Sequence, residues 1–275
     1  MKTVNVVGGG LAGAEAALYL SSHGVKVVLH DIKPKEKTPA HRSEKFAELV
    51  CSNSLKSNDY LSNACGLLKE EMRRLGSLTM EAAEHTRVPA GGALAVDRDQ
   101  FSRIVTETLK KHPNIEIVEK EAKDFPATEY TIVATGPLTS DDLAEKIAER
   151  FGGNLYFYDA AAPIVTAESI DFSKAFIGDR YGKGSGDYVN CPLNREEYEA
   201  FYQALLTAEK ADVHGFDGTQ VFEGCMPIEV MAARGEMVMA FGPMKPVGLV
   251  DPRTGREPYA AVQLRAENSA GTMYN

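Results

Sequence analysis

The sequence predicts an α/β fold, with a mostly parallel sheet covered by helices and a second, inserted domain of mixed α+β structure. Strand-like and helix-like segments alternate from the N-terminus to about residue 151, which is the pattern of a parallel sheet with helices on its faces. From Gly152 onward, short strand-like runs are interrupted by Gly, Asn, Asp and Pro, and one long helix is expected after Asn194. We therefore expect a first domain over residues 1–151 and an inserted domain over residues 152–275.

The composition is that of an ordinary globular protein. Of the 275 residues, 44% are hydrophobic and 25% are charged, and the length permits a large core or two domains. No run of about 18 apolar residues is present, and Met1-Lys2-Thr3 leads directly into the first strand, so neither a transmembrane helix nor a signal peptide is expected. These features predict a cytoplasmic protein. The net charge of −9 argues mildly against a nucleic-acid partner but is compatible with a local basic patch.

The most specific motif lies in the first fifteen residues. It has the pattern G-x-G-x-x-G, with the apolar run Val4–Val7 before it and a run of helix formers after it, and it consists of Gly8, Gly9, Gly10, Leu11, Ala12 and Gly13. In this setting the first glycine permits a tight turn, the second lets the backbone approach a pyrophosphate, and the third lets the helix pack closely on the strand. The anion would lie on the free N–H groups at the helix N-terminus.

A second strand, Val25–Asp31, ends on an acidic residue. The helix before it is expected to stop at His23-Gly24, because glycine commonly follows the last helical residue. Asp31 lies 18 positions after Gly13, close to the roughly 20 at which a carboxylate meets the ribose hydroxyls of a dinucleotide. Strand, glycine motif, helix and terminal acid together predict a Rossmann-like dinucleotide-binding unit. A glycine-rich turn in an ordinary α/β unit is the alternative.

Capping residues and apolar periodicity predict the other elements. Asn63, Ser77 and Asp97 are good N-caps for helices over residues 64–75, 78–85 and 98–111. Strands are expected at residues 93–96, 115–118 and 130–134, and Thr139 is expected to open a helix that ends near Phe151. Residues 46–51 fit either a short helix or a short strand. Beyond them, strands are expected at 155–158, 164–165, 175–177, 188–191 and 259–265, and helices at 195–208 and 228–234.

Five blocks of the sequence resemble one family: Pro39–His41, Glu48–Leu55, Gly66–Arg73, Val88–Arg98 and Phe222–Glu229. Over its whole length the chain resembles the folate-dependent, FAD-containing tRNA (uracil-54 C5)-methyltransferases, called TrmFO. The flavoproteins that modify the tRNA wobble uridine share the glycine-rich start but not the last block. Asp31 stands where the family more often has Glu, which keeps the carboxylate. The family continues well beyond residue 275, so the resemblance implies a C-terminally truncated member.

The resemblance implies transfer of a one-carbon unit from 5,10-methylenetetrahydrofolate to C5 of uracil-54 in the tRNA T-loop, with FAD as the relay and NADH or NADPH as the reductant. It assigns FAD binding to the first domain and the substrate and tRNA side to the inserted domain. A thiolate that adds to C6 of uracil makes C5 nucleophilic, a flavin supplies hydride chemistry, and the base must leave its loop to reach a thiol. The alternatives are a generic FAD-dependent oxidoreductase, for which a second nucleotide-binding motif is lacking, and a catalytically inactive fragment that binds tRNA or a nucleotide.

Two of the four cysteines are candidate catalytic residues. None of the four forms a C-x-x-C pair, so neither a disulfide nor a metal site is expected. The last resemblance block makes Cys225 the candidate thiol that attacks uracil, and a turn into the helix at 228 would place it near a helix N-terminus, where a thiol pKa falls. A buried, inert cysteine is the alternative. Cys51 matches a family cysteine that acts near the flavin and receives a supporting role, whereas Cys65 and Cys191 are interpreted as packing residues.

Further candidates are less specific. Cofactor contact is predicted for the glycine motif and Asp31, and His41 and Arg98 are additional candidates. The alternatives are a solvated loop histidine and a surface arginine in the first helical turn. Five basic residues form either an RNA-facing patch or a solvated face, since three glutamates lie among them. The basic residues are Lys33, Lys35, Lys37, Arg42 and Lys45.

Overall fold

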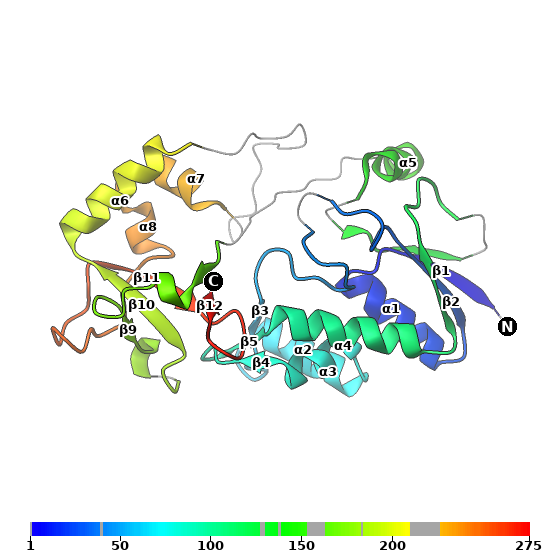
Figure 1. The fold of residues 1–275 in the computed structure, drawn as a ribbon, viewed down its shortest axis with the longest axis horizontal. Coiled ribbons are helices and arrows are strands. Elements are labelled where there is room, and N and C mark those ends of the chain that lie inside the picture. Colours follow the sequence, from blue (N-terminus) through cyan, green and yellow to red (C-terminus); the bar gives the residue numbers. More distant parts are fainter. Residues whose placement is uncertain are drawn as a thin grey trace. The chain divides into compact units, whose positions relative to one another are not determined.

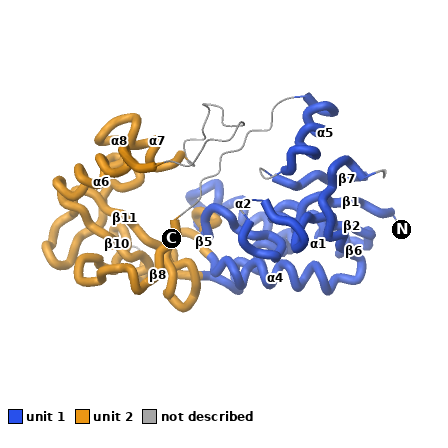
Figure 2. Tube along the Cα trace, turned by 45° about the horizontal axis from the view of Figure 1, so that its top comes forward, with its two compact units in different colours: residues 1–53, 58–87, 96–161 blue, residues 54–57, 88–95, 162–275 orange. Residues whose placement is uncertain are grey.

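The computed structural model describes residues 2–38, 41–126, 130–136, 139–152, 163–182, 184–209 and 226–275. The chain divides into two compact units, shown in Figure 2. Unit 1 comprises residues 1–53, 58–87 and 96–161, and unit 2 comprises residues 54–57, 88–95 and 162–275. Two short segments that the sequence places in the first domain, 54–57 and 88–95, therefore cluster with unit 2. The assignment of separate roles to residues 1–151 and 152–275 stays a prediction.

Unit 1 is built on a four-stranded sheet of order β6-β2-β1-β7, in which every pairing is parallel. Figure 1 labels the central strands β1 and β2, and Figure 2 labels all four. The strands are β1 (Thr3–Val7), β2 (Lys26–Asp31), β6 (Ile115–Glu119) and β7 (Thr131–Val133). Helix α1 (Leu11–Ser22) joins β1 to β2 and contacts both strands. Because β1 and β2 are parallel neighbours, the glycine motif after β1 and Asp31 at the end of β2 lie at the same edge of the sheet. The predicted α/β class with a parallel sheet is confirmed.

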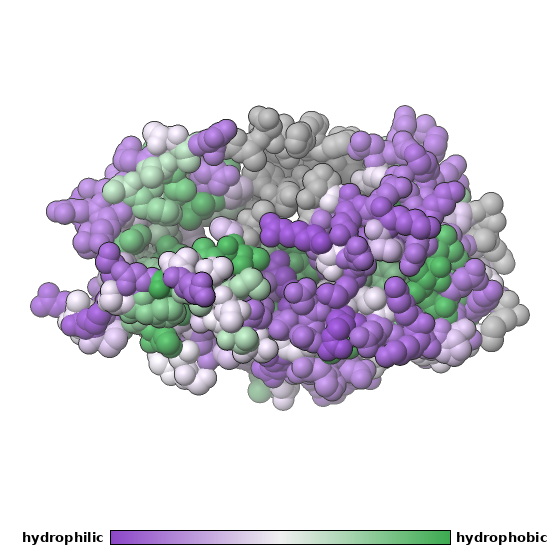
Figure 3. Space-filling model, in the orientation of Figure 1, coloured by the Kyte–Doolittle hydropathy of each residue, from purple (hydrophilic) through white to green (hydrophobic). Residues whose placement is uncertain are grey.

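The helices of unit 1 begin at the predicted caps, with one exception. They are α2 (Ala64–Arg74), α3 (Leu78–His85), α4 (Arg98–Lys111) and α5 (Asp141–Phe151). The side chains of Asn63, Ser77 and Asp97 each accept a hydrogen bond from an N–H group in the first turn of α2, α3 and α4, respectively. Helix α5 opens at Ser140 instead of Thr139, whose hydroxyl donates to the carbonyl of Gly136 in the preceding turn. Figure 3 shows hydrophilic side chains over α4, where Glu107 pairs with Arg103 and Lys111.

Residues 46–51 form neither the helix nor the strand that the sequence predicts. The N–H of Phe46 donates to Thr106 Oγ1 on α4 at 2.8 Å, and the N–H of Ala47 donates to the carbonyl of Gly9, also at 2.8 Å. Ala47 has a positive φ of 50°. The segment thus satisfies its backbone by binding the glycine motif and α4.

Unit 2 contains antiparallel sheet and a small helical cluster. Strand β10 (Tyr188–Leu193) pairs with β9 (Phe176–Ile177) and β11 (Ala260–Arg265), and β8 (Val165–Thr166) pairs with β12 (Met273–Tyr274). A further sheet of order β3-β5-β4 is formed by Ser54–Ser57, Ala93–Val96 and Arg87–Val88. The helices are α6 (Arg195–Thr207), α7 (Ile228–Ala233) and α8 (Glu236–Phe241), with 3₁₀ turns at Ala167–Ser169 and Arg180–Gly182. Helix α8 was not predicted, and the strand expected at 155–158 lies outside the described residues.

Tyr198 holds the helical cluster of unit 2 together. Its side chain is fully buried and packs with Ala232, Met239 and Ala260. Its hydroxyl donates to the carbonyl of Glu236 and accepts from the N–H of Ala240, so it links α6 to both ends of α8. In the described part of the chain, no helix combines the length and the apolar character needed to cross a membrane.

We expect Tyr198→Phe to lower the free energy of unfolding by about 1–3 kcal/mol, because it removes the hydroxyl that accepts from the buried N–H group of Ala240 and donates to the carbonyl of Glu236. The measurement is urea unfolding followed by circular dichroism. The control is Tyr202→Phe on the same helix, whose hydroxyl makes no hydrogen bond that the described residues show. Equal unfolding midpoints for the two variants would contradict the role of the Tyr198 hydroxyl.

Candidate functional site

The glycine motif forms a turn so tight that two of its glycines exclude any side chain. Gly8 has φ +101°, and a Cβ placed on Gly13 would lie 1.8 Å from the carbonyl oxygen of Gly8. A Cβ on Gly10, in contrast, would meet no atom within 4 Å. Gly8 and Gly13 therefore allow α1 to approach the turn, whereas Gly10 leaves open space beside the backbone.

The N-terminus of α1 is open to a ligand. Gly10 is the N-cap and has no side chain that could accept from the first N–H groups of the helix. Leu11 and Ala12, the first two helical residues, line a cavity of about 320 Å³. The N–H groups and the positive end of the helix dipole are therefore placed to bind an anion there.

This cavity lies at the carboxyl ends of β1 and β2. It is bounded by the glycine motif, by residues 30–33 and 120–122, by the segments after β7, and by His41, Glu48 and Val50. Of the predicted site residues, Gly8, Gly9, Gly10, Leu11, Ala12, Asp31 and His41 line it together. Its volume is at the small end of the roughly 300–1,000 Å³ typical of ligand sites, which suits one half of a dinucleotide.

Asp31 ties the end of β2 to the glycine motif. Its Oδ2 accepts the N–H of Gly9 at 2.6 Å, and its Oδ1 accepts the N–H of Lys33 at 2.8 Å. Each carboxylate oxygen has a second lone pair, so both remain able to accept from a hydroxyl group. Asp31 therefore shapes the motif and still offers the acceptors that ribose hydroxyls require.

Lys33 and Glu48 form a buried pair that no pattern in the sequence predicts. Lys33 is only 3% exposed, so for this residue both alternatives, an RNA-facing patch and a solvated face, are wrong. Its ammonium donates to the carbonyl of Lys45 and lies 3.6 Å from Glu48 Oε2. Burial lowers the pKa of Lys33, and the carboxylates of Asp31 and Glu48 oppose this shift. The alternation of charges along this loop does not indicate the pair, because its members are fifteen positions apart.

His41 lines the same cavity. Its Nδ1 lies 2.9 Å from Thr38 Oγ1, and its N–H donates to the carbonyl of Thr38 at 3.0 Å. Burial lowers its pKa, and the ammonium of Lys33 lowers it further. The imidazole is therefore neutral at neutral pH. A local turn with Thr38 holds this residue, so His41 is not the freely solvated loop histidine of the alternative prediction.

Arg98 does not line the cavity; it holds the segment that contains Cys51. Its Nη1 donates to the carbonyl of Leu49 at 2.7 Å, and its Nη2 donates to the carbonyl of Cys51 at 3.3 Å. Cys51 is exposed, and its neighbour Val50 lines the cavity. The structure thus places Cys51 beside the cavity wall and gives Arg98 a role that neither predicted alternative contains.

The other cysteines differ in their surroundings. Cys225 lies outside the described residues. Cys65 and Cys191 are half-buried, and burial raises the pKa of the Cys191 thiol, which favours its protonated form. The described residues contain no group of three or more His, Cys, Asp or Glu side chains that could hold a metal ion.

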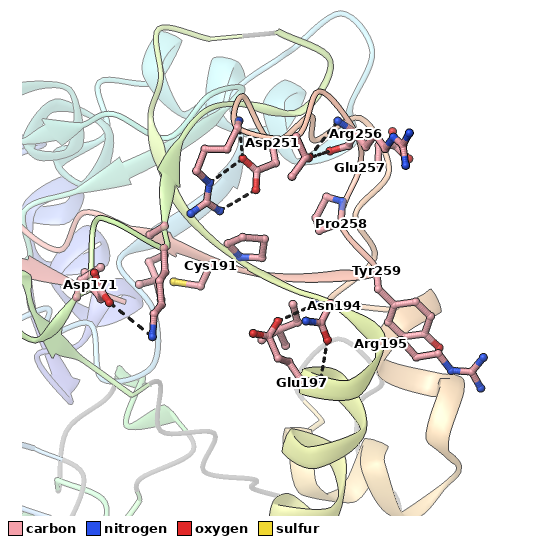
Figure 4. Close-up of a pocket in the computed structure, with 18 of the residues that line it drawn as sticks. Asp171, Cys191, Asn194, Arg195, Glu197, Asp251, Arg256, Glu257, Pro258 and Tyr259 are labelled. Atoms are coloured by element: carbon pink, nitrogen blue, oxygen red, sulfur yellow. Dashed lines mark hydrogen bonds and ion pairs between the residues drawn. The ribbon is translucent and has the colours of Figure 1, made fainter.

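A larger cavity, of about 1050 Å³, lies within unit 2 between β10, the start of α6 and residues 251–259 (Figure 4). Its acidic groups are already bound. The carboxylate of Asp251 accepts from Arg253 Nε at 2.9 Å and Nη2 at 2.7 Å. Glu197 completes the N-terminal capping box of α6, and Asp171 accepts from Ser173. These charges are partnered within the chain and do not call for a ligand.

Residues 3–275 match the family model described as glucose inhibited division protein A. The chain belongs to this family. It is 60% identical over 273 residues to a protein of Acetivibrio thermocellus named methylenetetrahydrofolate–tRNA-(uracil-5-)-methyltransferase TrmFO, covering 99% of this chain and 62% of that relative. It is 57% identical over 275 residues to the Staphylococcus aureus protein of the same name, covering 100% of this chain and 63% of the relative. These matches confirm the family resemblance.

The chain spans about 62% of the length of the Acetivibrio relative. A solved structure of Aquifex aeolicus GidA superposes with a TM-score of 0.61 and 14% identity, covering 99% of this chain and 49% of that one. At this identity the superposition shows the fold alone. It supports the Rossmann-like fold of a GidA-family protein.

We expect Gly13→Ala to lower the free energy of unfolding by about 3 kcal/mol or more, because the new methyl group would overlap a backbone carbonyl. Gly10→Ala is the matched variant. Its methyl group enters open space, and its φ of −70° is accessible to alanine, so we expect a loss below about 1 kcal/mol. Thermal unfolding by circular dichroism compares the two. Equal losses would show that the close approach of α1 does not limit stability.

We expect Arg98→Ala to accelerate amide hydrogen exchange in a peptide covering residues 49–53 by roughly tenfold, because two charge-assisted hydrogen bonds to that segment are lost. The control is Arg103→Ala, since Arg103 pairs with Gln100 and Glu107 within α4. Exchange that is unchanged in Arg98→Ala, or equally accelerated in both variants, would refute the role of Arg98.

Proposed function

We propose that the chain carries the FAD-binding unit and the substrate-side unit of an enzyme that transfers a one-carbon unit from 5,10-methylenetetrahydrofolate to C5 of uracil-54 in tRNA, with NADH or NADPH as reductant. The observation that carries this proposal is the cavity in which the glycine motif, the uncapped α1 and Asp31 meet. The names of relatives at 57–60% identity supply the folate and tRNA substrates. A tRNA substrate also supports a cytoplasmic location.

The residues that line this cavity fit the adenosine diphosphate half of FAD. The backbone N–H groups at residues 10–12 would bind the pyrophosphate, and the free space beside Gly10 would admit it. Asp31 would accept from ribose hydroxyls. When bound, FAD supplies redox chemistry that no side chain provides.

Cys225 is proposed as the thiol that adds to C6 of the extruded uracil. The addition forms an S–C6 bond and places the electron pair at C5, which then bonds to the one-carbon unit. Loss of the C5 proton breaks the bond between that carbon and its nitrogen carrier, and a hydride drawn from NADH or NADPH then reduces the exocyclic carbon to a methyl group as the S–C6 bond breaks and the thiolate leaves. Helix α7 begins three residues after Cys225, with Pro227 as its N-cap. Cys51, whose backbone Arg98 holds, is proposed as a supporting thiol.

The first test is a visible absorption spectrum of the purified chain, with the bound cofactor released and identified. A flavin spectrum at one FAD per chain is expected, either as purified or after addition of FAD. A chain that stays colourless and takes up no added FAD would refute the assignment of FAD binding to these residues. FAD binding without methyl transfer would favour the alternative of a nucleotide-binding fragment that is inactive in isolation.

We expect Cys225→Ala to abolish methylation of a tRNA transcript, because no other group is proposed to attack C6. Cys51→Ala should reduce the rate, and Cys65→Ala, which removes a packing thiol, should leave it unchanged. The measurement is incorporation of label from 5,10-methylenetetrahydrofolate in the presence of FAD and NADPH, with a transcript lacking uridine 54 as the substrate control. Methylation by Cys225→Ala at the parent rate would show that this cysteine is not the nucleophile.

A further inference from the structure

Glu48 presents a buried acceptor that the described residues do not satisfy. Its Oε1 accepts the N–H groups of Arg42 at 2.8 Å and Ser43 at 3.0 Å. Its Oε2 is buried and has no hydrogen-bond partner among the described residues. A buried carboxylate oxygen without a donor is costly, so its presence calls for an explanation.

Lys33 compensates the charge of Glu48 but not its hydrogen-bonding capacity. The distance between Lys33 Nζ and Glu48 Oε2 is 3.6 Å, which is longer than a hydrogen bond. The ammonium instead donates to the carbonyl of Lys45. The side chains of Lys33 and Glu48 are 4% and 11% exposed, so bulk water supplies few donors. A donor for Oε2 is therefore expected from the cavity that Glu48 lines.

Glu48 is held against the glycine motif by its neighbours. The N–H of Ala47 donates to the carbonyl of Gly9, and a Cβ on Gly9 would lie 2.6 Å from Cδ1 of Phe46. Asp31 accepts the N–H of the same glycine. The two polar groups of Gly9 thus bind two segments that each bring a carboxylate to one cavity.

Asp31 and Glu48 place two carboxylates on the wall of the cavity, so the part of a ligand that binds beside them must carry hydrogen-bond donors. A pyrophosphate offers acceptors and negative charge, so it cannot satisfy Glu48 Oε2. The adenosine half of a dinucleotide has donors in its ribose hydroxyls and in the adenine amino group. We propose that Glu48 Oε2 accepts a hydrogen bond from one of these adenosine donors, and that Lys33, whose ammonium lies 3.6 Å from this oxygen, is the positioning residue that holds the carboxylate at the cavity wall. This inference rests on the proposed FAD binding and deepens it.

The decisive variant is Glu48→Gln, because the fold itself fixes how the amide is oriented. Two backbone N–H groups point at the Oε1 position, so the carbonyl of glutamine occupies that place and its NH₂ group replaces Oε2. The NH₂ group of the glutamine then faces the hydrogen-bond donor of the ligand, and no hydrogen bond can form between them. We expect the dissociation constants of FAD and of ADP, measured by titration calorimetry, to rise roughly tenfold to a hundredfold. Glu44→Gln, on the exposed side of the same segment, is the control and should leave both constants unchanged.

Ligand analogues identify the donor. Removing the interacting group from ADP, as in 2′-deoxy-ADP, 3′-deoxy-ADP or purine riboside diphosphate, which has a hydrogen atom in place of the amino group, should weaken binding to the parent chain and leave binding to Glu48→Gln nearly unaffected. If the parent chain and Glu48→Gln bind a deoxy analogue equally well, the donor is the missing ribose hydroxyl. If they bind purine riboside diphosphate equally well, the donor is the adenine amino group. If Glu48→Gln weakens every analogue by the same factor, or weakens none, Glu48 does not contact the ligand and the proposal is overturned.

Lys33 is tested by rescue. Lys33→Met should weaken ADP binding as Glu48→Gln does. Lys33→Arg keeps the cation and should restore most of the affinity, while the melting temperatures of the two Lys33 variants stay equal. Failure of methyl transfer with these binding differences intact would favour the inactive nucleotide-binding fragment over the proposed function and leave this inference standing. A parent chain that binds neither FAD nor ADP would refute the inference.

Discussion

The close approach of α1 to the turn after β1 is the constraint on which unit 1 depends. Because a Cβ on Gly13 would lie 1.8 Å from the carbonyl oxygen of Gly8, only glycine lets the helix begin directly at the end of the strand. This placement brings the positive end of the helix dipole to the edge of the sheet, next to the carboxyl end of β2. The packing of α1 against the turn after β1 therefore creates the anion-binding geometry, and no charged side chain is required for it.

Gly9 extends this arrangement through its own peptide groups. Its N–H binds Asp31, and its carbonyl binds Ala47, so the end of β2 and the segment before Cys51 are fixed to the same turn. The segment needs no secondary structure of its own, because Gly9, Thr106 and Arg98 satisfy its backbone. The glycine motif, Thr106 and Arg98 together thus position the segment that lies between the cavity and Cys51.

An element can be predicted from the sequence where the residues that determine it lie close together in the chain. The caps Asn63, Ser77 and Asp97, and the strand–glycine–helix–strand start, depend on residues within one turn or one unit, and the structure has these elements at the expected places. The Lys33–Glu48 pair and the bonds from Arg98 to Leu49 and Cys51 join residues 15 to 49 positions apart. No periodicity or motif encodes such contacts, and the six-residue helix α8 and the four-residue strand β3 are too short for periodicity to show.

The buried pair of Lys33 and Glu48 is difficult to explain as a device for stability. Moving two charges out of water costs several kcal/mol per ion, and the attraction between them repays this only when the remaining donors and acceptors are satisfied. Here Glu48 Oε2 has no donor among the described residues. A hydrophobic pair of similar size would fill the same space at lower cost. The incomplete hydrogen bonding is therefore better understood as preorganisation, in which the chain bears a cost in the free state that a bound ligand with a matching donor removes.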